Sequence, residues 1–301
     1  MLFGILSEEQ QQTARKELGL DLCLIAPDDS RYRASIVRES NGWSGTFRIV
    51  KLKPPAFESL GLPSSVKRLT DYQQGLVLVT GPKGCGKTTT LASMINLINS
   101  NRTEHIITVE DPIEYVHKSK RCQVTQRAMR ANTVSYANAL RGALREDPDI
   151  IMVGELRDLD TISAAITAAE TGHLVLASLH TISAMRTVDR IIDAFPAKQQ
   201  TQIRVMLAES IRGVVSQQLL LRADGKGVVM AAEVLVNNVT VRKTIIDGKT
   251  FQLDNVMQTG RSEGMIRMDD SIEDLLEEGL ITLETAREFA RDPEKIGVKN
   301  G

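Results

Sequence analysis

From Gly75 to Phe195 the chain alternates short apolar runs with segments in which apolar residues recur every three or four positions. The first pattern predicts β-strands and the second predicts α-helices. The predicted strands are Leu76–Thr80, His105–Val109, Ile150–Val153 and Leu174–Leu179, and the predicted helices are Thr89–Asn99, Ser135–Arg145, Asp158–Thr171 and Ala184–Phe195. The strands are apolar at nearly every position, so both faces of their sheet should be covered. The pattern predicts an α/β fold with a mostly parallel sheet between helices.

The first fifty residues follow a different pattern. A helix is expected over about Ser7–Leu18, and three extended segments follow it. These are Asp21–Ala26, Arg31–Arg38 and Gly45–Lys51, separated by turn residues at Asp28-Asp29-Ser30 and at Asn41-Gly42. Short extended runs with turns between them indicate a small antiparallel α+β unit.

A proline-rich stretch follows this unit and indicates a linker. We therefore expect a small domain over residues 1–53, a linker over 54–63 and a large domain over 64–301. Beyond Pro196 the pattern is mainly helical, with helices such as Ser271–Glu278 and Leu283–Arg291. It is interrupted by a hairpin of Gln218–Arg222 and Val228–Val236.

Composition narrows the class of protein. Hydrophobic residues make up 42% and charged residues 25% of the 301 positions, as in ordinary soluble globular proteins. The chain has 37 Lys and Arg against 38 Asp and Glu, and this balance argues against nucleic acid as the main partner. Three scattered cysteines and the lack of a long apolar run indicate a reducing, cytoplasmic location.

A glycine-rich turn joins the first strand of the large domain to its helix. Its order, Gly81-Pro82-Lys83-Gly84-Cys85-Gly86-Lys87-Thr88-Thr89, matches the Walker A pattern. The glycines let backbone N–H groups point at phosphate oxygens, and the following helix start adds further donors. Lys87 is expected to contact the β- and γ-phosphates, and the Thr88 hydroxyl is expected to bind Mg²⁺. The turn predicts that the chain binds a nucleoside triphosphate.

A carboxylate ends another strand of the same sheet. The apolar run Ile150–Val153 leads through Gly154 to Glu155, where a carboxylate can hold the hydrated Mg²⁺ or orient an attacking water. The same residue can instead be a solvated glutamate before a helix capped by Asp158. The pattern alone leaves both interpretations open.

Further acids and two histidines follow neighbouring strands. Glu110, Asp111 and Glu114 come just after the strand that ends at Val109, and ligands in open α/β sheets bind at the carboxyl ends of strands. His180 ends the strand Leu174–Leu179 on that same edge. His173 precedes this strand, about 20 Å away at about 3.3 Å per residue, so the two histidines should not share a metal ion.

Together these motifs resemble the secretion-superfamily hexameric ATPases, which power type II secretion and type IV pili. The resemblance rests on the Walker A turn, the acidic box Glu110–Glu114, the segments Leu144–Asp149 and Val153–Asp158, and the histidine box Gly172–Thr181. The tail residues Met257–Gly260, Gly264, Met265 and Asp269 are most similar to the pilus retraction branch. The likeness runs from about Ile5 to Ile296.

The resemblance implies a RecA-like core, C-terminal helices and a PAS-like N-terminal domain. It implies that Glu155, Lys87, Glu110 and His180 take part in catalysis on ATP, and that Glu114 and His173 belong to the nucleotide site. In the family, arginines of the PAS-like domain reach the γ-phosphate, and Arg33 and Arg48 occupy the matching positions. The implied assembly is a homohexamer on the cytoplasmic face of the inner membrane. It would work with a pilus platform protein and the pilus machinery, peripheral to the bilayer and without nucleic acid.

The sequence departs from the family pattern at three places. The N-terminal domain begins late, which indicates a truncated PAS-like domain. Cys85 replaces the usual small hydroxyl residue of the Walker A turn, and Thr240–Asp247 differs from the retraction motif of the family while keeping Arg242. The altered segment leaves open an accessory or regulatory pilus or secretion ATPase. A RecA-like nucleic-acid motor, which would share the core sheet, and a nucleotide sensor that does not hydrolyse are further alternatives.

Overall fold

The computed structural model describes residues 2–26, 30–50, 53–129 and 132–298. The chain forms two compact units, one of residues Met1–Pro54 with Pro112–His117, the other of residues Pro55–Asp111 with Lys118–Gly301. The predicted turn at Asp28-Asp29-Ser30 falls largely outside the described residues.

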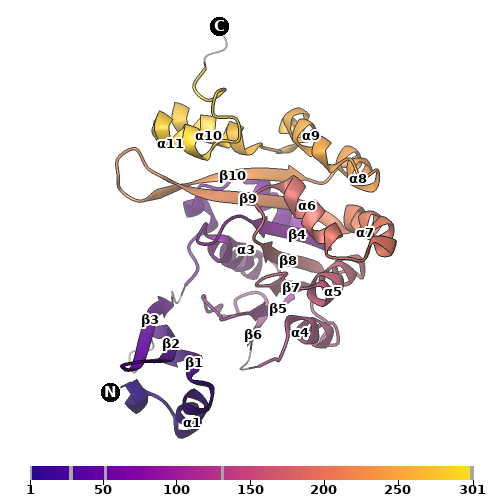
Figure 1. Cartoon of the computed structure of the whole chain (residues 1–301). Coiled ribbons are helices and arrows are strands. Elements are labelled where there is room, and N and C mark those ends of the chain that lie inside the picture. The colour runs from indigo at the N-terminus through magenta and orange to yellow at the C-terminus, as the bar shows by residue number, and fades with distance from the viewer. Residues whose placement is uncertain (1, 27–29, 51–52, 130–131, 299–301) are drawn as a thin grey trace. The chain divides into compact units, whose positions relative to one another are not determined.

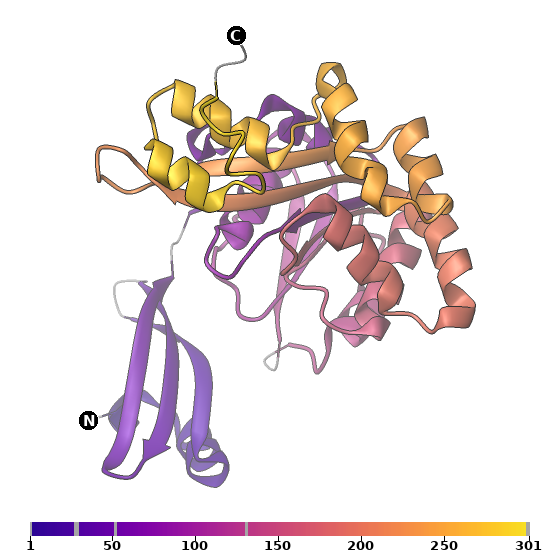
Figure 2. The ribbon, with the colours of Figure 1, turned by 45° about the horizontal axis from the view of Figure 1, so that its top comes forward.

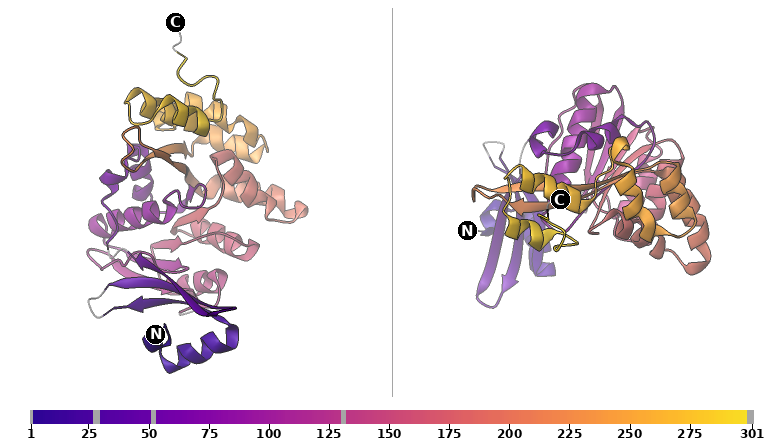
Figure 3. Two further views of the ribbon diagram at one scale, coloured as in Figure 1. Left: turned by 60° about the vertical axis from the view of Figure 1, so that its left-hand side comes forward. Right: turned by 90° about the horizontal axis from the view of Figure 1, so that it is seen from above.

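The first unit is a helix packed on a three-stranded antiparallel sheet (Figure 3). After a 3-10 turn at Leu2–Ile5, its elements are α1 (Glu8–Glu17), β1 (Gly19–Ile25), β2 (Arg31–Glu39) and β3 (Gly42–Val50). Ser7 caps α1, because its hydroxyl accepts the Gln10 N–H while the Gln10 side chain accepts the Ser7 N–H. Ala34 and Ile36 are fully buried on one face of β2, so α1 and the sheet share a small core.

The second unit contains a seven-stranded sheet in the order β10-β9-β4-β8-β7-β5-β6 (Figure 1). Its strands are β4 (Gly75–Thr80), β5 (His105–Glu110), β6 (Gln123–Ala128), β7 (Ile150–Val153), β8 (Leu174–Leu179), β9 (Ile211–Leu221) and β10 (Val228–Val236). All neighbouring strands are parallel except β9 and β10, which form an antiparallel hairpin. The predicted α/β class with a mostly parallel sheet is confirmed.

Helices cover both faces of this sheet. One face packs against α4 (Tyr136–Ala143), α5 (Leu159–Glu170), α6 (Ala184–Asp193), α7 (Ala197–Ser210), α8 (Val239–Ile246) and α9 (Leu253–Thr259). The other face packs against α3 (Lys87–Asn101), α2 (Ser64–Arg68) and the short 3-10 helix η2 (Phe57–Leu60). Side chains of β4 alternate between the two cores, which explains why the strand is apolar at successive positions.

The C-terminal helices α10 (Met268–Glu277) and α11 (Leu283–Phe289) pack near the far end of the β9–β10 hairpin (Figure 2). Leu220 and Ala231 of the hairpin share a separate small core with Met268, Ile272 and Ala286 of the helices. This layer is distinct from the two cores of the main sheet.

One predicted boundary was wrong and one strand was not predicted. The first hairpin strand begins at Ile211, not at Gln218, so the hairpin belongs to the central sheet. Strand β6 was missed because its alternating polar residues lack an apolar run. In addition, Phe57 is 5% exposed and packs against the sheet, so part of the predicted linker belongs to the core of the second unit.

Candidate functional site

The Walker A turn lies between β4 and α3, at the carboxyl end of β4. Gly86 is the N-cap of α3, so Lys87, Thr88 and Thr89 form the first turn of that helix. Gly81 has φ +141°, and a Cβ there would lie 2.3 Å from the carbonyl oxygen of Gln217. Only glycine fits at this position, because the turn runs against β9. Pro82, Lys83 and Gly84 are exposed, which leaves the turn accessible to a ligand.

Lys87 lies within this turn and is 8% exposed. Its Nζ donates to the carbonyl oxygens of Gly81 and Pro82, both at 2.8 Å. Burial lowers the pKa of the Lys87 ammonium, although Cys85 and Glu155 act in the opposite direction. Burial also raises the pKa of the Cys85 thiol. The ammonium is thus a poorly hydrated charge, which strengthens its attraction to an anion.

A polar chain connects Lys87 to Glu155 through His180. The Lys87 Nζ lies 3.1 Å from His180 Nδ1, and His180 Nε2 lies 3.2 Å from a Glu155 carboxylate oxygen. Because an ammonium only donates, Nδ1 accepts and the ring proton is on Nε2, facing the carboxylate. Arg157 contacts the other Glu155 oxygen at 2.8 Å. The structure therefore brings together three residues that sequence reasoning selected from three separate strand ends.

The adjacent strand end carries the acidic residues. Glu110 is 4% exposed, and one of its oxygens accepts from the Thr108 hydroxyl at 2.7 Å and from the Gln126 amide at 3.0 Å. Asp111 follows it and is partly buried. The catalytic role of Glu110 stays a prediction, and its two donors show how the carboxylate is oriented.

Gly154 stands where β7 passes this acidic strand end. A Cβ on Gly154 would lie 3.1 Å from the Tyr136 hydroxyl and 3.3 Å from the Val109 carbonyl oxygen. Burial raises the pKa of Tyr136 far above its usual value, and Asp111 adds to this effect, so the phenol keeps its proton. The close approach explains why glycine precedes Glu155.

Sequence reasoning missed two buried polar residues of β9 that hold the turn in place. The Gln217 amide donates to the Cys85 carbonyl oxygen at 2.7 Å and accepts from the Thr90 hydroxyl at 3.0 Å. Ser216 and Thr80 share a hydrogen bond of 2.8 Å between their hydroxyls. The available signal was three consecutive polar residues, Ser216 to Gln218, in the apolar run of β9.

Other predicted site residues lie elsewhere in the fold. His173 precedes β8, at the edge of the sheet opposite the Walker A turn, and its Nδ1 lies 3.0 Å from the Ala168 carbonyl oxygen. Arg33, Arg48 and Glu114 belong to the first unit. Arg33 and Arg48 are directly paired in the register of β2 and β3, so their side chains share one face of that sheet. The roles of all four residues stay predictions.

Comparison with known proteins gives the family. Residues 58–261 match the type II/IV secretion system protein family. The chain belongs to this family. It is 44% identical to a twitching motility protein of Neisseria gonorrhoeae over 98% of the chain and 79% of the relative. It is also 44% identical to the type IV pilus retraction ATPase PilT of Pseudomonas aeruginosa, over 98% of the chain and 86% of the relative.

Among solved structures, the fold matches the pilus retraction motor PilT with bound ADP. The TM-score is 0.92 at 42% identity, over 98% of this chain and 84% of that one. The resemblance found in the motifs is thereby confirmed. In the part of the chain that the structure describes, no helix has the length and apolar character needed to cross a membrane.

Proposed function

We propose that this chain is the motor ATPase of type IV pilus retraction, working as a homohexameric ring. It is an ATPase of the pilus retraction type. The observation that supports the catalytic part is the chain of contacts from Lys87 through His180 to Glu155. These contacts connect a phosphate-binding turn to a carboxylate at a neighbouring strand end.

The residues of the turn have different roles in phosphoryl transfer. The backbone N–H groups from Gly84 to Thr89 bind the phosphates, and Lys87 turns from the Gly81 and Pro82 carbonyls to the β- and γ-phosphates. Glu155 orients the attacking water, while His180 keeps that carboxylate in place beside the γ-phosphate side of the site. Arg33 and Arg48 offset the charge that develops on the γ-phosphate.

Magnesium fits the residues at this site. Thr88 is partly exposed on the first turn of α3, beside Lys87. The partly buried carboxylate of Glu155 is connected to Lys87 through the ring of His180. A Mg²⁺ ion bound with ATP neutralises phosphate charge and needs few protein ligands. Thr88 would hold it directly and Glu155 through water.

The proposed setting is the cytoplasmic face of the bacterial inner membrane, where the ring would act on a platform protein and the rest of the pilus machinery. The pilus-related names of the relatives support this setting. The balanced charge of the chain supports a protein partner over nucleic acid.

The direct test is retraction in cells that lack this chain. Cells given back the chain should retract pili and show twitching, and the purified chain should hydrolyse ATP only with Mg²⁺. Glu155→Gln should fail in both assays, whereas the exposed Glu170→Gln should succeed in both. Normal twitching with the Glu155→Gln chain would remove Glu155 from the mechanism, and normal retraction in cells that lack this chain would overturn the proposal.

One observation supports a second candidate, an accessory motor that assists another retraction ATPase. Helix α8, which covers most of the Thr240–Asp247 segment, departs from the retraction motif of the family. Under this alternative the chain hydrolyses ATP normally, yet it restores twitching only when a second retraction ATPase is present in the same cells.

A further inference from the structure

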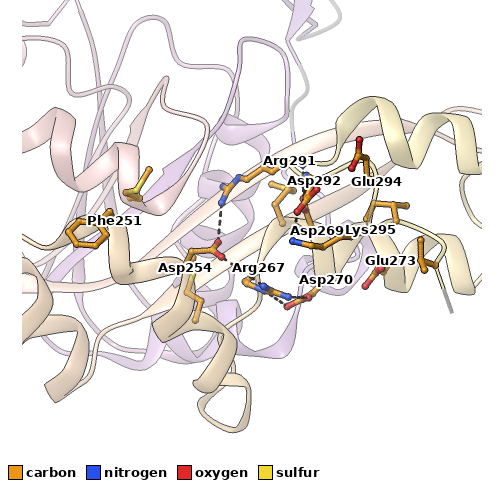
Figure 4. Close-up of a pocket in the computed structure, with 15 residues that line it drawn as sticks. Phe251, Asp254, Arg267, Asp269, Asp270, Glu273, Arg291, Asp292, Glu294 and Lys295 are labelled. Atoms are coloured by element: carbon orange, nitrogen blue, oxygen red, sulfur yellow. Dashed lines mark hydrogen bonds and ion pairs between the residues drawn. The ribbon is translucent and has the colours of Figure 1, made fainter. Parts of the chain in front are cut away.

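A cavity of about 800 Å³ lies in the C-terminal part of the second unit, away from the Walker A turn (Figure 4). Met257, Met268 and Ile296 line it but are at most 1% exposed, so they form the packed wall behind the cavity and not its accessible surface. Phe251 stands at one side with 69% of its surface exposed. Val298 is 58% exposed and Met185 is half-buried, so the accessible apolar surface of the cavity is made by Phe251, Val298 and Met185.

Acidic side chains dominate the charge of this cavity. Its lining includes six carboxylates, which are Asp254, Asp269, Asp270, Glu273, Asp292 and Glu294. It includes three cations, Arg267, Arg291 and Lys295. The cavity therefore has a formal charge of −3, six negative charges against three positive ones.

The three cations are already engaged by the protein. Arg291 pairs with the fully buried Glu233 at 2.5 Å and with Asp254 at 3.4 Å. Arg267 pairs with Asp270 at 2.7 Å, and Lys295 pairs with Asp292. These cations therefore do not neutralise the other carboxylates of the cavity.

Three of the carboxylates have no cationic partner within the described residues, namely Asp269, Glu273 and Glu294. Asp269 accepts from the backbone N–H groups of Arg291 and Asp292, so Glu273 and Glu294 are the two that a ligand could pair with. Partial burial raises the pKa of Glu273, and the nearby Asp270 and Glu277 raise it further. Its negative charge is thus unfavourable in the chain alone, and a cation placed beside it would relieve this cost.

We propose that this cavity binds a basic segment of a partner protein. Apolar side chains of that segment would contact Phe251 and Val298, and flanking Lys or Arg residues would face Glu273 and Glu294. Nucleic acids and anionic membrane surfaces carry the same sign of charge as the cavity, so its field repels them. The combination of exposed apolar side chains with acidic ones matches an amphipathic basic segment, as in other helix-in-groove contacts.

The test uses a labelled amphipathic peptide of leucine and lysine, about four helical turns long. Fluorescence anisotropy measures its binding to the full chain at physiological salt, where the Debye length is about 8 Å. Reversing the charge in the double variant Glu273→Lys, Glu294→Lys should weaken binding at least about tenfold. The matched control Glu17→Lys, Glu170→Lys makes the same change in charge at helix ends outside the cavity, and it should change binding by less than about twofold. Thermal unfolding checks that both variants are folded.

A second peptide, with serine in place of leucine, tests whether apolar side chains contribute to binding beyond charge attraction. It should bind at least about tenfold more weakly. Bound Leu/Lys peptide should also slow hydrogen exchange in α9 and α10. The proposal would be overturned if the two protein variants weakened binding equally, or if the two peptides bound equally. Absence of binding, or protection confined to other helices, would overturn it as well.

Discussion

At the residue scale, the polar chain from Lys87 to Glu155 separates binding from turnover. Lys87 holds phosphate charge in both the ground state and the transition state, whereas Glu155 acts on the water. We predict that Lys87→Ala abolishes ATP binding and that Glu155→Gln keeps ATP bound but lowers kcat by at least about 10²-fold. Nucleotide titration and steady-state turnover on both variants measure the difference. Near-normal hydrolysis by Glu155→Gln would show that Glu155 does not orient the water, and Glu110 or Asp111 would then be the better candidate.

The paired arginines of the first unit lead to a second prediction. Arg33 and Arg48 face each other across β2 and β3, which suits a shared contact with a phosphate. Each change to alanine should lower kcat by about 10²-fold or more while ADP affinity changes little, because the charge they meet develops in the transition state. Arg38→Ala is the matched control, since Arg38 lies on the same strand but on the opposite face. Unchanged kcat in both arginine variants would show that they are surface residues.

Gln217 lies under the Walker A turn and leads to a third prediction. Gln217→Ala leaves the Cys85 carbonyl and the Thr90 hydroxyl without their partner. An unsatisfied buried group costs about 1–3 kcal/mol, so the free energy of unfolding should fall by about this amount. ATP affinity should fall with it, because the turn loses its support from β9. Denaturant unfolding of Gln217→Ala beside Gln218→Ala, whose side chain points to the other face of β9, measures the effect. Equal stability of the two variants would contradict this role.

At the element scale, the C-terminal layer should behave as a separate cooperative unit. Ile272 is fully buried in the small core that α10 and α11 share with the hairpin. Ile272→Ala should destabilise this layer by about 2–5 kcal/mol, whereas Leu283→Ala, at 42% exposure, should cost much less. Hydrogen exchange should accelerate in α10 and α11 before it accelerates in β4 or β8. Uniform acceleration over the whole unit would show that the layer and the sheet unfold together.

The elements also show what the sequence could predict. Strands β4, β7 and β8 were found because they are buried on both faces and therefore apolar throughout. Strand β9 was read too short because buried Ser216 and Gln217 interrupt its apolar run to hold the Walker A turn. The position of the candidate site could be predicted, because its residues follow strands whose carboxyl ends lie at one edge of the sheet. Its supporting contacts, such as Gln126 on Glu110, depend on the missed strand β6 and could not be predicted from local pattern.

At the scale of the whole molecule, the first unit exposes apolar side chains that a neighbouring chain could cover. Its sheet buries Ala34 and Ile36, yet on the same face Phe47 and Ile49 of the edge strand β3 are 43% and 70% exposed. Apolar side chains on an edge strand are a common contact surface between chains. In a ring, one patch of each subunit is buried against a different patch of the next.

We therefore predict a hexamer of about six times the 33.1 kDa of the chain. ATPase activity per chain should rise with protein concentration as rings assemble. Phe47→Asp should shift the hexamer toward smaller species, whereas Val37→Asp, on the other face of the same sheet and 40% exposed, should leave it intact. Light scattering across a dilution series, read beside specific activity, measures both effects. A monomer with full activity at every concentration would contradict a ring motor, because force on a pilus requires subunits that move against one another.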